Sequence, residues 1–167
     1  MSWRPMTSGD LAHVQVLADT IHVEHPEEPH VFSERLRLYP QGCAVLEVDG
    51  RLIGYALTHP WRYGEPPSLN SHLEHVPSDA TTYYVHDVAL LPEARGMGYA
   101  VRIGEWLVDH AARGGFPNLS LVAVNGSQPF WERLGFRVAA IPGLASKLLS
   151  YGPDAVLMVR DLAQDDR

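Results

Sequence analysis

Residues 86–100 constrain the fold more than any other part of the chain. An apolar strand runs into a turn that holds Arg95, Gly96 and Gly98, and a helical pattern follows at once. No Ser, Thr, Asp or Asn stands where a helix cap belongs, so the first N–H groups lack a side-chain acceptor. Free amides, the positive end of a helix dipole and glycines that permit close approach together favour an anion site. The guanidinium of Arg95 has a fork geometry that suits phosphate.

An ordinary tight turn is the alternative for a two-glycine pattern, and the motif alone does not decide between the two readings. Two other phosphate motifs are excluded. No Gly-Lys-Ser/Thr triplet follows, as a P-loop requires, and the dinucleotide fingerprint needs a third glycine where Val101 stands.

The rest of the chain alternates between helical and strand periods. Helices are predicted over 8–21, 31–38, 101–113 and 128–134, the last capped by Ser127, and strands over 44–48, 52–58, 83–90, 119–124, 136–139 and 155–160. Asp49-Gly50 is a hairpin signal between the first two strands. The long segment from His59 to Ala80 contains four prolines, and such loops often shape a binding site.

This order predicts a mixed α/β domain with three layers. We expect a mixed central sheet of about six to seven strands flanked by about four helices, in a single domain over residues 1–167.

Composition narrows the function. The chain of 167 residues has a net charge of −7 and no Lys/Arg cluster, which argues against nucleic acid as a partner and mildly favours cationic acceptors. Cys43 is the only cysteine, so no internal disulfide or cysteine-based metal cluster is expected. The N-terminal residues lack a signal-peptide pattern, and no apolar run has the length of a membrane helix. We therefore expect a soluble, cytoplasmic protein without a membrane partner.

The chain resembles the GNAT (Gcn5-related) N-acetyltransferases. Their signature, Arg/Gln-x-x-Gly-x-Gly/Ala, is matched at every fixed position by residues 95–100, and residues 88–92 match the Val-x-x-x-Pro lead-in. Their second motif is also present, with Asn125 ahead of Phe-Trp-Glu-Arg-Leu-Gly-Phe at 130–136. The order of elements agrees from Trp3 to about Arg160. The resemblance implies a GNAT-type fold and acetyl-CoA as the co-substrate.

The resemblance also assigns the residues that would bind this co-substrate. The strand before the turn would pair with the pantetheine arm, through Val88, Ala89 and Leu90. Amides of the turn and the helix start would hold the diphosphate, at Arg95, Gly96, Met97, Gly98, Tyr99 and Ala100. The cofactor arm would also be met by Asn125, with Ser127 and Trp131 close by.

The chain departs from this family at the general acid. The family usually places Tyr after the Phe or Leu of the second motif, to protonate the departing thiolate, whereas this chain has Trp131 there. The indole N–H is a donor only and is no usable acid at neutral pH. Tyr151, in the loop before the last strand, is the substitute candidate, with a packing role as the alternative.

His86 is the candidate general base. It lies in the strand that leads to the turn, and an unperturbed histidine pKa of about 6.5 suits proton removal from an ammonium. Arylalkylamine-type members carry a base histidine in the corresponding strand, so the resemblance supports this role. The alternative is a core histidine bonded to a neighbour such as Asp87.

Acceptor recognition is expected from the loop around residues 22–30 and from residues 59–80. Glu24 and Glu28 are candidates for binding a cationic amine, with plain surface charge as the alternative for each, and Trp61 and Tyr84 are further acceptor residues. Tyr84 shares a strand face with His86 by period-2 spacing. A metal site at His22, Glu24, His25 and Glu28 is less favoured than a solvated loop, because the spacing is irregular and interrupted by prolines. Cys43 is expected to be a small core residue, with an acyl-cysteine as the alternative.

Together these observations predict an acetyl-CoA-dependent N-acetyltransferase that acts by direct transfer to a small-molecule primary amine, without a metal. The alternatives are a protein or peptide N-acetyltransferase and a non-catalytic CoA-binding module. The oligomeric state stays open, with a homodimer as one candidate.

Overall fold

The computed structural model describes residues 3–162. The strands are β1 (Trp3–Pro5), β2 (Cys43–Val48), β3 (Arg51–Trp61), β4 (Thr82–Leu90), β5 (Asn118–Ala123), β6 (Arg137–Val138) and β7 (Val156–Asp161). The helices are α1 (Leu11–Ile21), α2 (Pro29–Leu38), α3 (Tyr99–Arg113), α4 (Gln128–Arg133) and α5 (Ala145–Leu149), with short 3₁₀ helices at Ser8–Asp10, Pro40–Gly42 and Pro92–Ala94. None of the helices in this range is long and apolar enough to cross a membrane.

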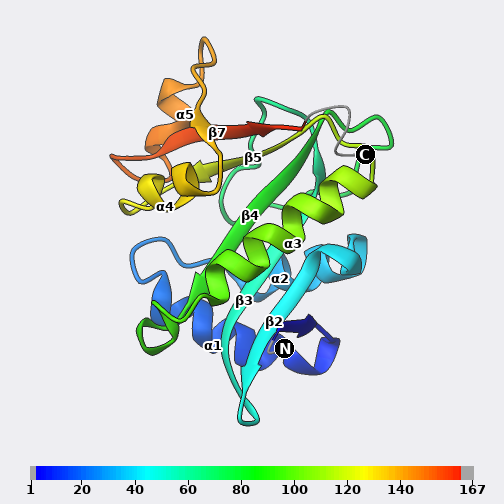
Figure 1. Ribbon diagram of the computed structural model, residues 1–167, viewed down its shortest axis with the longest axis vertical. Coiled ribbons are helices and arrows are strands. Elements are labelled where there is room, and N and C mark those ends of the chain that lie inside the picture. The colour runs from blue at the N-terminus through cyan, green and yellow to red at the C-terminus, as the bar shows by residue number, and fades with distance from the viewer. Residues whose placement is uncertain (1–2, 163–167) are drawn as a thin grey trace.

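The strands form one mixed sheet of seven strands in the order β1-β2-β3-β4-β5-β7-β6 (Figure 1). Only β4 and β5 pair in parallel, and every other neighbouring pair is antiparallel. The β2–β3 hairpin turns at Asp49 and Gly50, whose φ angles of 52° and 76° are those of a type I′ turn, as the dipeptide predicts.

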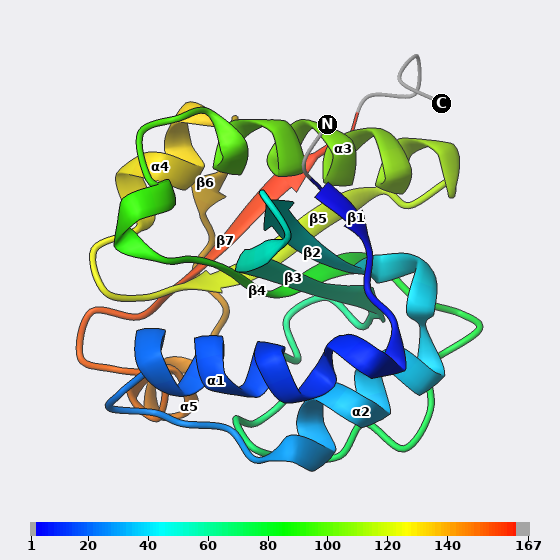
Figure 2. The same ribbon diagram turned by 90° about the horizontal axis from the view of Figure 1, so that it is seen from below.

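Helices cover both faces of the sheet (Figure 2), with α3 and α4 on one side and α1 and α2 on the other. The apolar stripe predicted for α3 is confirmed, since Ile103, Leu107 and Ala111 are all buried. On α1 the buried positions are Val14, Leu17 and Ala18, at helical spacing. The three-layer mixed α/β fold predicted from the sequence is therefore correct.

Two elements were not predicted from the sequence, and one predicted detail is wrong. Trp3–Pro5 is too short to show a strand period, and its proline is tolerated because β1 is an edge strand. The helix Ala145–Leu149 has only five residues and no buried stripe. Ser127 does precede α4, but its side chain makes no capping hydrogen bond, because its backbone is already in the helical region at φ −80° and ψ −5°.

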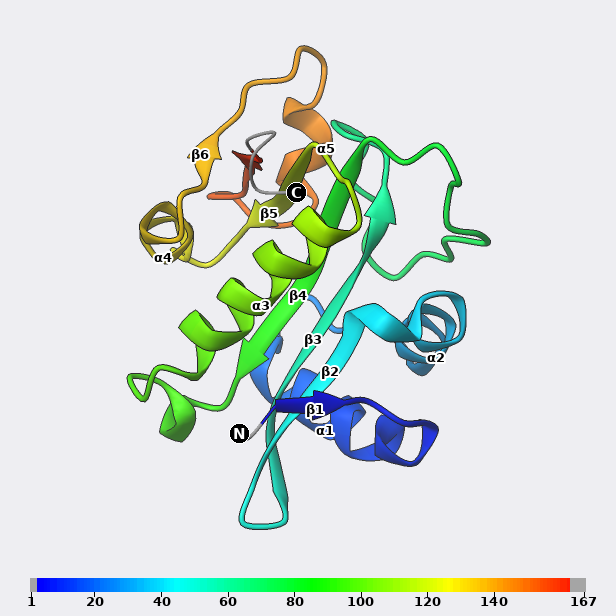
Figure 3. The same ribbon diagram turned by 45° about the vertical axis from the view of Figure 1, so that its right-hand side comes forward.

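The parallel pairing of β4 with β5 is short, so the two strands separate along part of their length. Pairs form only from Tyr83↔Leu119 to Val85↔Leu121, after which the two strands diverge (Figure 3). From His86 onward, the edge of β4 that faces β5 has no strand partner among the described residues. This edge of β4 therefore keeps backbone groups free for a ligand.

A β-bulge lies at the same point on the other side of β4. Leu57 of β3 is opposite Asp87, but the next residue, Thr58, is opposite Val85, so His86 is the extra residue. Consecutive residues of a regular strand point to opposite faces, and a bulge breaks this rule and re-aims side chains. His86 and Asp87 consequently both line the smaller cavity, which neither Val85 nor Val88 reaches.

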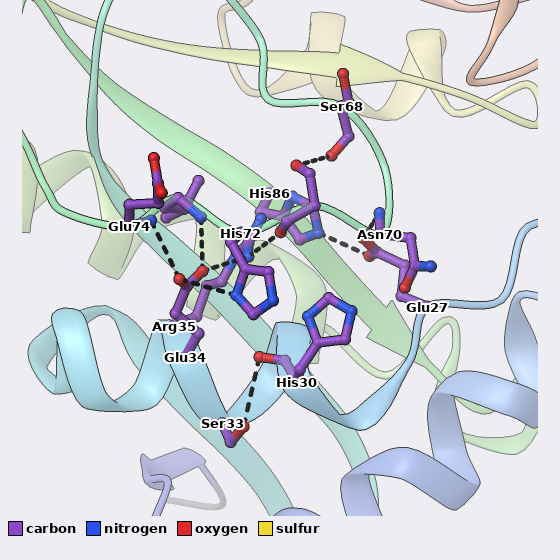
Figure 4. A network of polar contacts seen from close by, with 12 residues as sticks. Glu27, His30, Ser33, Glu34, Arg35, Ser68, Asn70, His72, Glu74 and His86 are labelled. Atoms are coloured by element: carbon purple, nitrogen blue, oxygen red, sulfur yellow. Dashed lines mark hydrogen bonds and ion pairs between the residues drawn. The ribbon is translucent and has the colours of Figure 1, made fainter.

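The long loop between β3 and β4 is attached to α2 through Glu34 (Figure 4). This buried carboxylate accepts hydrogen bonds from the backbone N–H of Leu73 at 2.6 Å and of Glu74 at 3.1 Å, and from Arg35 Nη1 at 3.0 Å. Arg35 is fully buried and also donates to the Ser71 carbonyl at 2.7 Å. Burial opposes ionisation of Glu34, but the loop N–H groups outweigh it and lower the pKa of the carboxyl.

We predict that Glu34→Ala lowers the free energy of unfolding by about 3–5 kcal/mol, because it leaves the buried Arg35 charge without its hydrogen-bonded carboxylate. Urea denaturation measures the loss, with Arg37→Ala as the control. Arg37 is exposed on the same helix, and its replacement should change stability by less than about 0.5 kcal/mol. Since the pKa of Glu34 is lowered by folding, its contribution is present at neutral pH and fades as the pH falls below about 4.3. Equal losses in the two variants would contradict the attachment.

Candidate active site

Two joined cavities lie where β4 and β5 diverge. One is a groove of about 610 Å³ between the two strands. The other, of about 340 Å³, lies beneath the loop that follows α1. Both are lined by the same seven residues, Ile21, His22, His86, Asp87, Val122, Val124 and Asn125.

The groove collects most of the residues predicted to bind CoA. Its lining includes Val88, Ala89, Leu90, Arg95, Ala100, Asn125, Ser127 and Trp131. The remaining four, Gly96, Met97, Gly98 and Tyr99, form the turn and helix start between Arg95 and Ala100, with Gly96 to Gly98 exposed.

The turn has the geometry that an anion requires. Gly96 and Gly98 have φ angles of 80° and 84°, which favour glycine, and a Cβ atom at either position would meet no atom within 4 Å. Gly98 is the N-cap of α3 and provides no side-chain acceptor. The open space and the uncapped amides therefore fit a diphosphate at this helix start.

The turn after β5 closes the far side of the groove. Asn125 adopts a left-handed conformation at φ 53°, and Asp154 holds the turn by accepting the N–H of Gly126 at 2.8 Å. Trp131 is buried and packs edge-on against Phe130 and Phe136, with ring centroids at 5.0 and 5.4 Å. The indole is thus a wall of the groove.

His86 lies at the junction of the two cavities and pairs with Glu27. Its Nε2 is 2.7 Å from Glu27 Oε1, and the two side chains are only 2% and 9% exposed (Figure 4). The expected alternative partner, Asp87, binds a different histidine. With Nε2 directed at a carboxylate, Nδ1 is the nitrogen left for a substrate, and no described residue bonds to it.

Glu27 comes from the loop between α1 and α2, and its other oxygen accepts the backbone N–H of Asn70 at 2.8 Å. Burial disfavours its ionisation, but the adjacent His86 ring and the Asn70 N–H outweigh burial and lower the pKa of Glu27 to about 2. Glu27 is therefore a carboxylate at neutral pH. Only the folded chain brings it to His86, 59 residues away, so sequence spacing gives no signal for the pair.

A second histidine–carboxylate pair lies beside the first. His22 Nε2 is 2.9 Å from Asp87 Oδ2, and the Tyr55 hydroxyl donates to the same oxygen at 2.5 Å. Burial opposes protonation of His22, but the Asp87 carboxylate outweighs it and raises the pKa of the ring. The sequence indicates His22 only as a metal ligand or a loop residue, and no local pattern signals its pairing with Asp87.

The smaller cavity brings together two of the predicted acceptor residues. Glu24 and Tyr84 line it, together with the two predicted catalytic residues His86 and Tyr151. Tyr84 and His86 face the same side, as predicted, with ring centroids 6.5 Å apart. Tyr151 is buried, its hydroxyl donates to the Pro67 carbonyl, and burial raises its pKa to about 12.

Trp61 and Glu28 are predicted acceptor residues that line neither cavity. Trp61 lies outside because β3 extends to this residue and its indole N–H donates to the Glu65 carbonyl at 2.8 Å. Cys43 is buried at the start of β2, where burial raises its pKa to about 12, and it also lines neither cavity. Over residues 3–162, no group of three or more His, Cys, Asp or Glu side chains is arranged to hold a metal ion.

Comparison with solved structures identifies the fold. The loading GNATL domain of CurA from Lyngbya majuscula superposes with a TM-score of 0.79 at 16% identity, over 95% of this chain and 96% of that one. Naa20 from Chaetomium thermophilum, in complex with a bisubstrate analogue, gives 0.75 at 18% identity, over 99% and 88%. N-acetylglutamate synthase from Neisseria gonorrhoeae, complexed with coenzyme A and N-acetyl-glutamate, gives 0.69 at 23% identity, over 97% of this chain and 35% of that one.

No curated protein sequence is significantly similar to the chain. The model of the acetyltransferase (GNAT) family, however, matches residues 11–136, which include the strand, the glycine turn and the α4 region described above. The chain therefore belongs to the GNAT family of acyl-CoA-dependent acyltransferases.

Proposed function

We propose that the protein is an N-acetyltransferase that transfers the acetyl group of acetyl-CoA directly to a small-molecule primary amine. The observation that carries this proposal is the buried His86–Glu27 pair at the point where the groove meets the smaller cavity. A nucleophile in the cavity and a thioester in the groove would both adjoin this histidine.

The acyl donor would lie along the groove. The free edge of β4 offers backbone groups to an extended pantetheine arm, and the start of α3 offers uncapped amides to the diphosphate. An N–H near Val88 would polarise the thioester carbonyl. The Arg95 side chain is exposed beside this helix start and adds a positive charge.

His86 would act as the general base through Nδ1. Glu27 accepts the Nε2 proton, which leaves a lone pair on Nδ1 and stabilises the ring once it has taken a proton from the amine. The pair is almost fully buried, which holds its geometry and excludes competing water.

The cavity suits a cationic amine with an apolar body. Its lining contains the acidic residues Glu24, Glu27 and Asp87 and no Lys or Arg, so an ammonium is favoured over a carboxylate. Ile21, Val23 and Leu69 supply apolar surface.

A small acceptor is also favoured by the loop between β3 and β4. It is attached at two places beside the cavity, through the Tyr151–Pro67 and the Glu27–Asn70 hydrogen bonds. Leu69 of the loop lines the cavity itself. A polypeptide acceptor needs an open groove, which a loop attached at this place would narrow.

The acceptor class is tested with acetyl-CoA and two panels, one of small primary amines and one of peptides with free N-termini or lysines. Release of CoA thiol and the mass of the product are measured. We expect turnover with amines that lack a carboxylate. Turnover confined to peptides would show that the enzyme is a protein N-acetyltransferase. Binding of acetyl-CoA without turnover of either panel would indicate a non-catalytic CoA-binding module.

We predict that Gly98→Val abolishes acetyl-CoA binding, measured by calorimetry, because the side chain would occupy the space of the diphosphate. The matched control is Gly115→Val at the other end of α3. Gly115 has a φ of 77°, against 84° at Gly98, and nothing lies within 4 Å of its Cβ position. Both variants therefore carry similar backbone strain, about 1–3 kcal/mol, but only one should lose binding. Unchanged affinity in Gly98→Val would contradict the placement.

We predict that His86→Gln lowers the rate by about 10²–10⁴-fold, the usual effect of losing a positioned base. The rising limb of the pH–rate profile should vanish in the variant. Deprotonation of the acceptor produces a similar limb, so two amines of different pKa are compared. A limb that follows the amine pKa and survives in His86→Gln would show that the enzyme selects the free amine from solution.

A further inference from the structure

We propose that His22, held by Asp87 and Tyr55, is the proton donor to the departing CoA thiolate. The inference rests on the proposed function, and it assigns the step for which Trp131 is unsuited.

The position of His22 is the first argument. It is the C-cap of α1, where its backbone N–H bonds to the Ala18 carbonyl, and its ring contacts Asp87 of β4. It lines both the groove and the acceptor cavity, and its side chain is 26% exposed. A group at this junction can reach the sulfur of a thioester laid along β4.

Its hydrogen bonds are the second argument. Nε2 faces Asp87, whose two carboxylate oxygens lie at 2.9 and 3.1 Å, so the proton on this nitrogen is held. Tyr55 donates to the same carboxylate and fixes its orientation. Nδ1 has no hydrogen-bond partner among the described residues and is the nitrogen that can give up a proton.

The surrounding charges favour the protonated ring. Asp87 from β4 and Glu27 from the loop after α1 are acidic, and Tyr55 from β3 is neutral because burial raises its pKa well above the usual range. The C-terminal end of α1 adds the negative pole of a helix dipole. Glu24, His25, His86 and the tyrosines Tyr84 and Tyr151 complete the titratable lining of the cavity around His22, and burial raises the pKa of both tyrosines, so they are neutral.

The other candidate donors are less well placed. Tyr151 lines the acceptor cavity but not the groove, and its hydroxyl is already bonded to the Pro67 carbonyl. Trp131 lines the groove, but indole is not an acid at neutral pH.

In the proposed reaction, His86 accepts a proton from the acceptor and His22 donates a proton to the leaving thiolate. The bound ammonium gives one proton to His86 Nδ1, and the free amine nitrogen then bonds to the thioester carbonyl carbon and loses its second proton to solvent. The C–S bond breaks with its electron pair on sulfur, and the thiolate takes the proton from His22 Nδ1. Solvent then removes a proton from His86 and returns one to His22.

The test compares the wild type with His22→Gln, Asp87→Asn and Tyr151→Phe, with His13→Gln as the control. His13 is exposed on the same helix, outside both cavities. The pH dependence of kcat/KM for the amine is measured at saturating acetyl-CoA. We expect a falling alkaline limb in the wild type, in His13→Gln and in Tyr151→Phe.

In His22→Gln this limb should disappear, with a loss of about 10²-fold at neutral pH and unchanged affinity for acetyl-CoA. Asp87→Asn should move the limb to lower pH, since it removes the charge that favours the imidazolium, which a merely structural role would not do. A limb that survives in His22→Gln, or one that is lost in Tyr151→Phe, would overturn the assignment.

A second readout does not depend on acetyl transfer. The thiol of bound CoA is titrated by its thiolate absorbance, with desulfo-CoA as the blank. A neighbouring imidazolium stabilises a thiolate, so the thiol should ionise at lower pH on the wild type than on His22→Gln. Equal titrations would overturn the proposal. A His22-dependent titration in a wild type that acetylates no amine would support the contact and refute only the amine acceptor.

Discussion

The active site depends on one irregularity in the sheet, the bulge at His86. In a regular strand, His86 and Asp87 would point to opposite faces, and one of them would be buried under α3. The bulge turns both toward the face covered by α1 and α2, where each meets a partner from another element. Two histidine–carboxylate pairs are thereby brought around one cavity. The interruption of the β3–β4 ladder is compatible with stability because it lies next to a regular antiparallel register on either side.

The divergence of β4 from β5 serves the other substrate. Pairing ends at Val85 and Leu121, one residue before the bulge, so the free edge of β4 begins where its side chains are re-aimed. Unpaired backbone groups of a buried strand are costly unless a ligand or water satisfies them. The same strand thus presents backbone groups along its free edge to an extended ligand and side chains to the adjoining cavity, and α3 begins at the end of the groove.

Local patterns in the sequence predicted the parts of this arrangement that are contiguous in the chain. The glycine turn with its uncapped helix, the Asp49-Gly50 hairpin and the stripe of α3 each depend on neighbouring residues, and all three are correct. The two pairs could not be predicted this way, because Glu27 and His22 reach β4 across 59 and 65 residues. The bulge has no local signature either, since neither His86 nor Asp87 is a residue type that signals a bulge in a strand. Trp61 lines neither cavity, and the sequence could not indicate this, because an aromatic residue at a loop boundary fits a binding site or the end of a strand equally well.

The replacement of the family tyrosine by Trp131 has a consistent explanation in this geometry. The indole packs between Phe130 and Phe136 and forms an apolar wall, so α4 contributes shape to the groove and no acid. On the opposite wall, the end of α1 supplies a histidine with a carboxylate partner. His22 and Trp131 both line the groove, so a proton donor on α1 would face the same ligand as one on α4. The departing thiolate needs a proton, and a residue of either helix can provide it. A general acid on α1 in place of one on α4 therefore requires no change of fold.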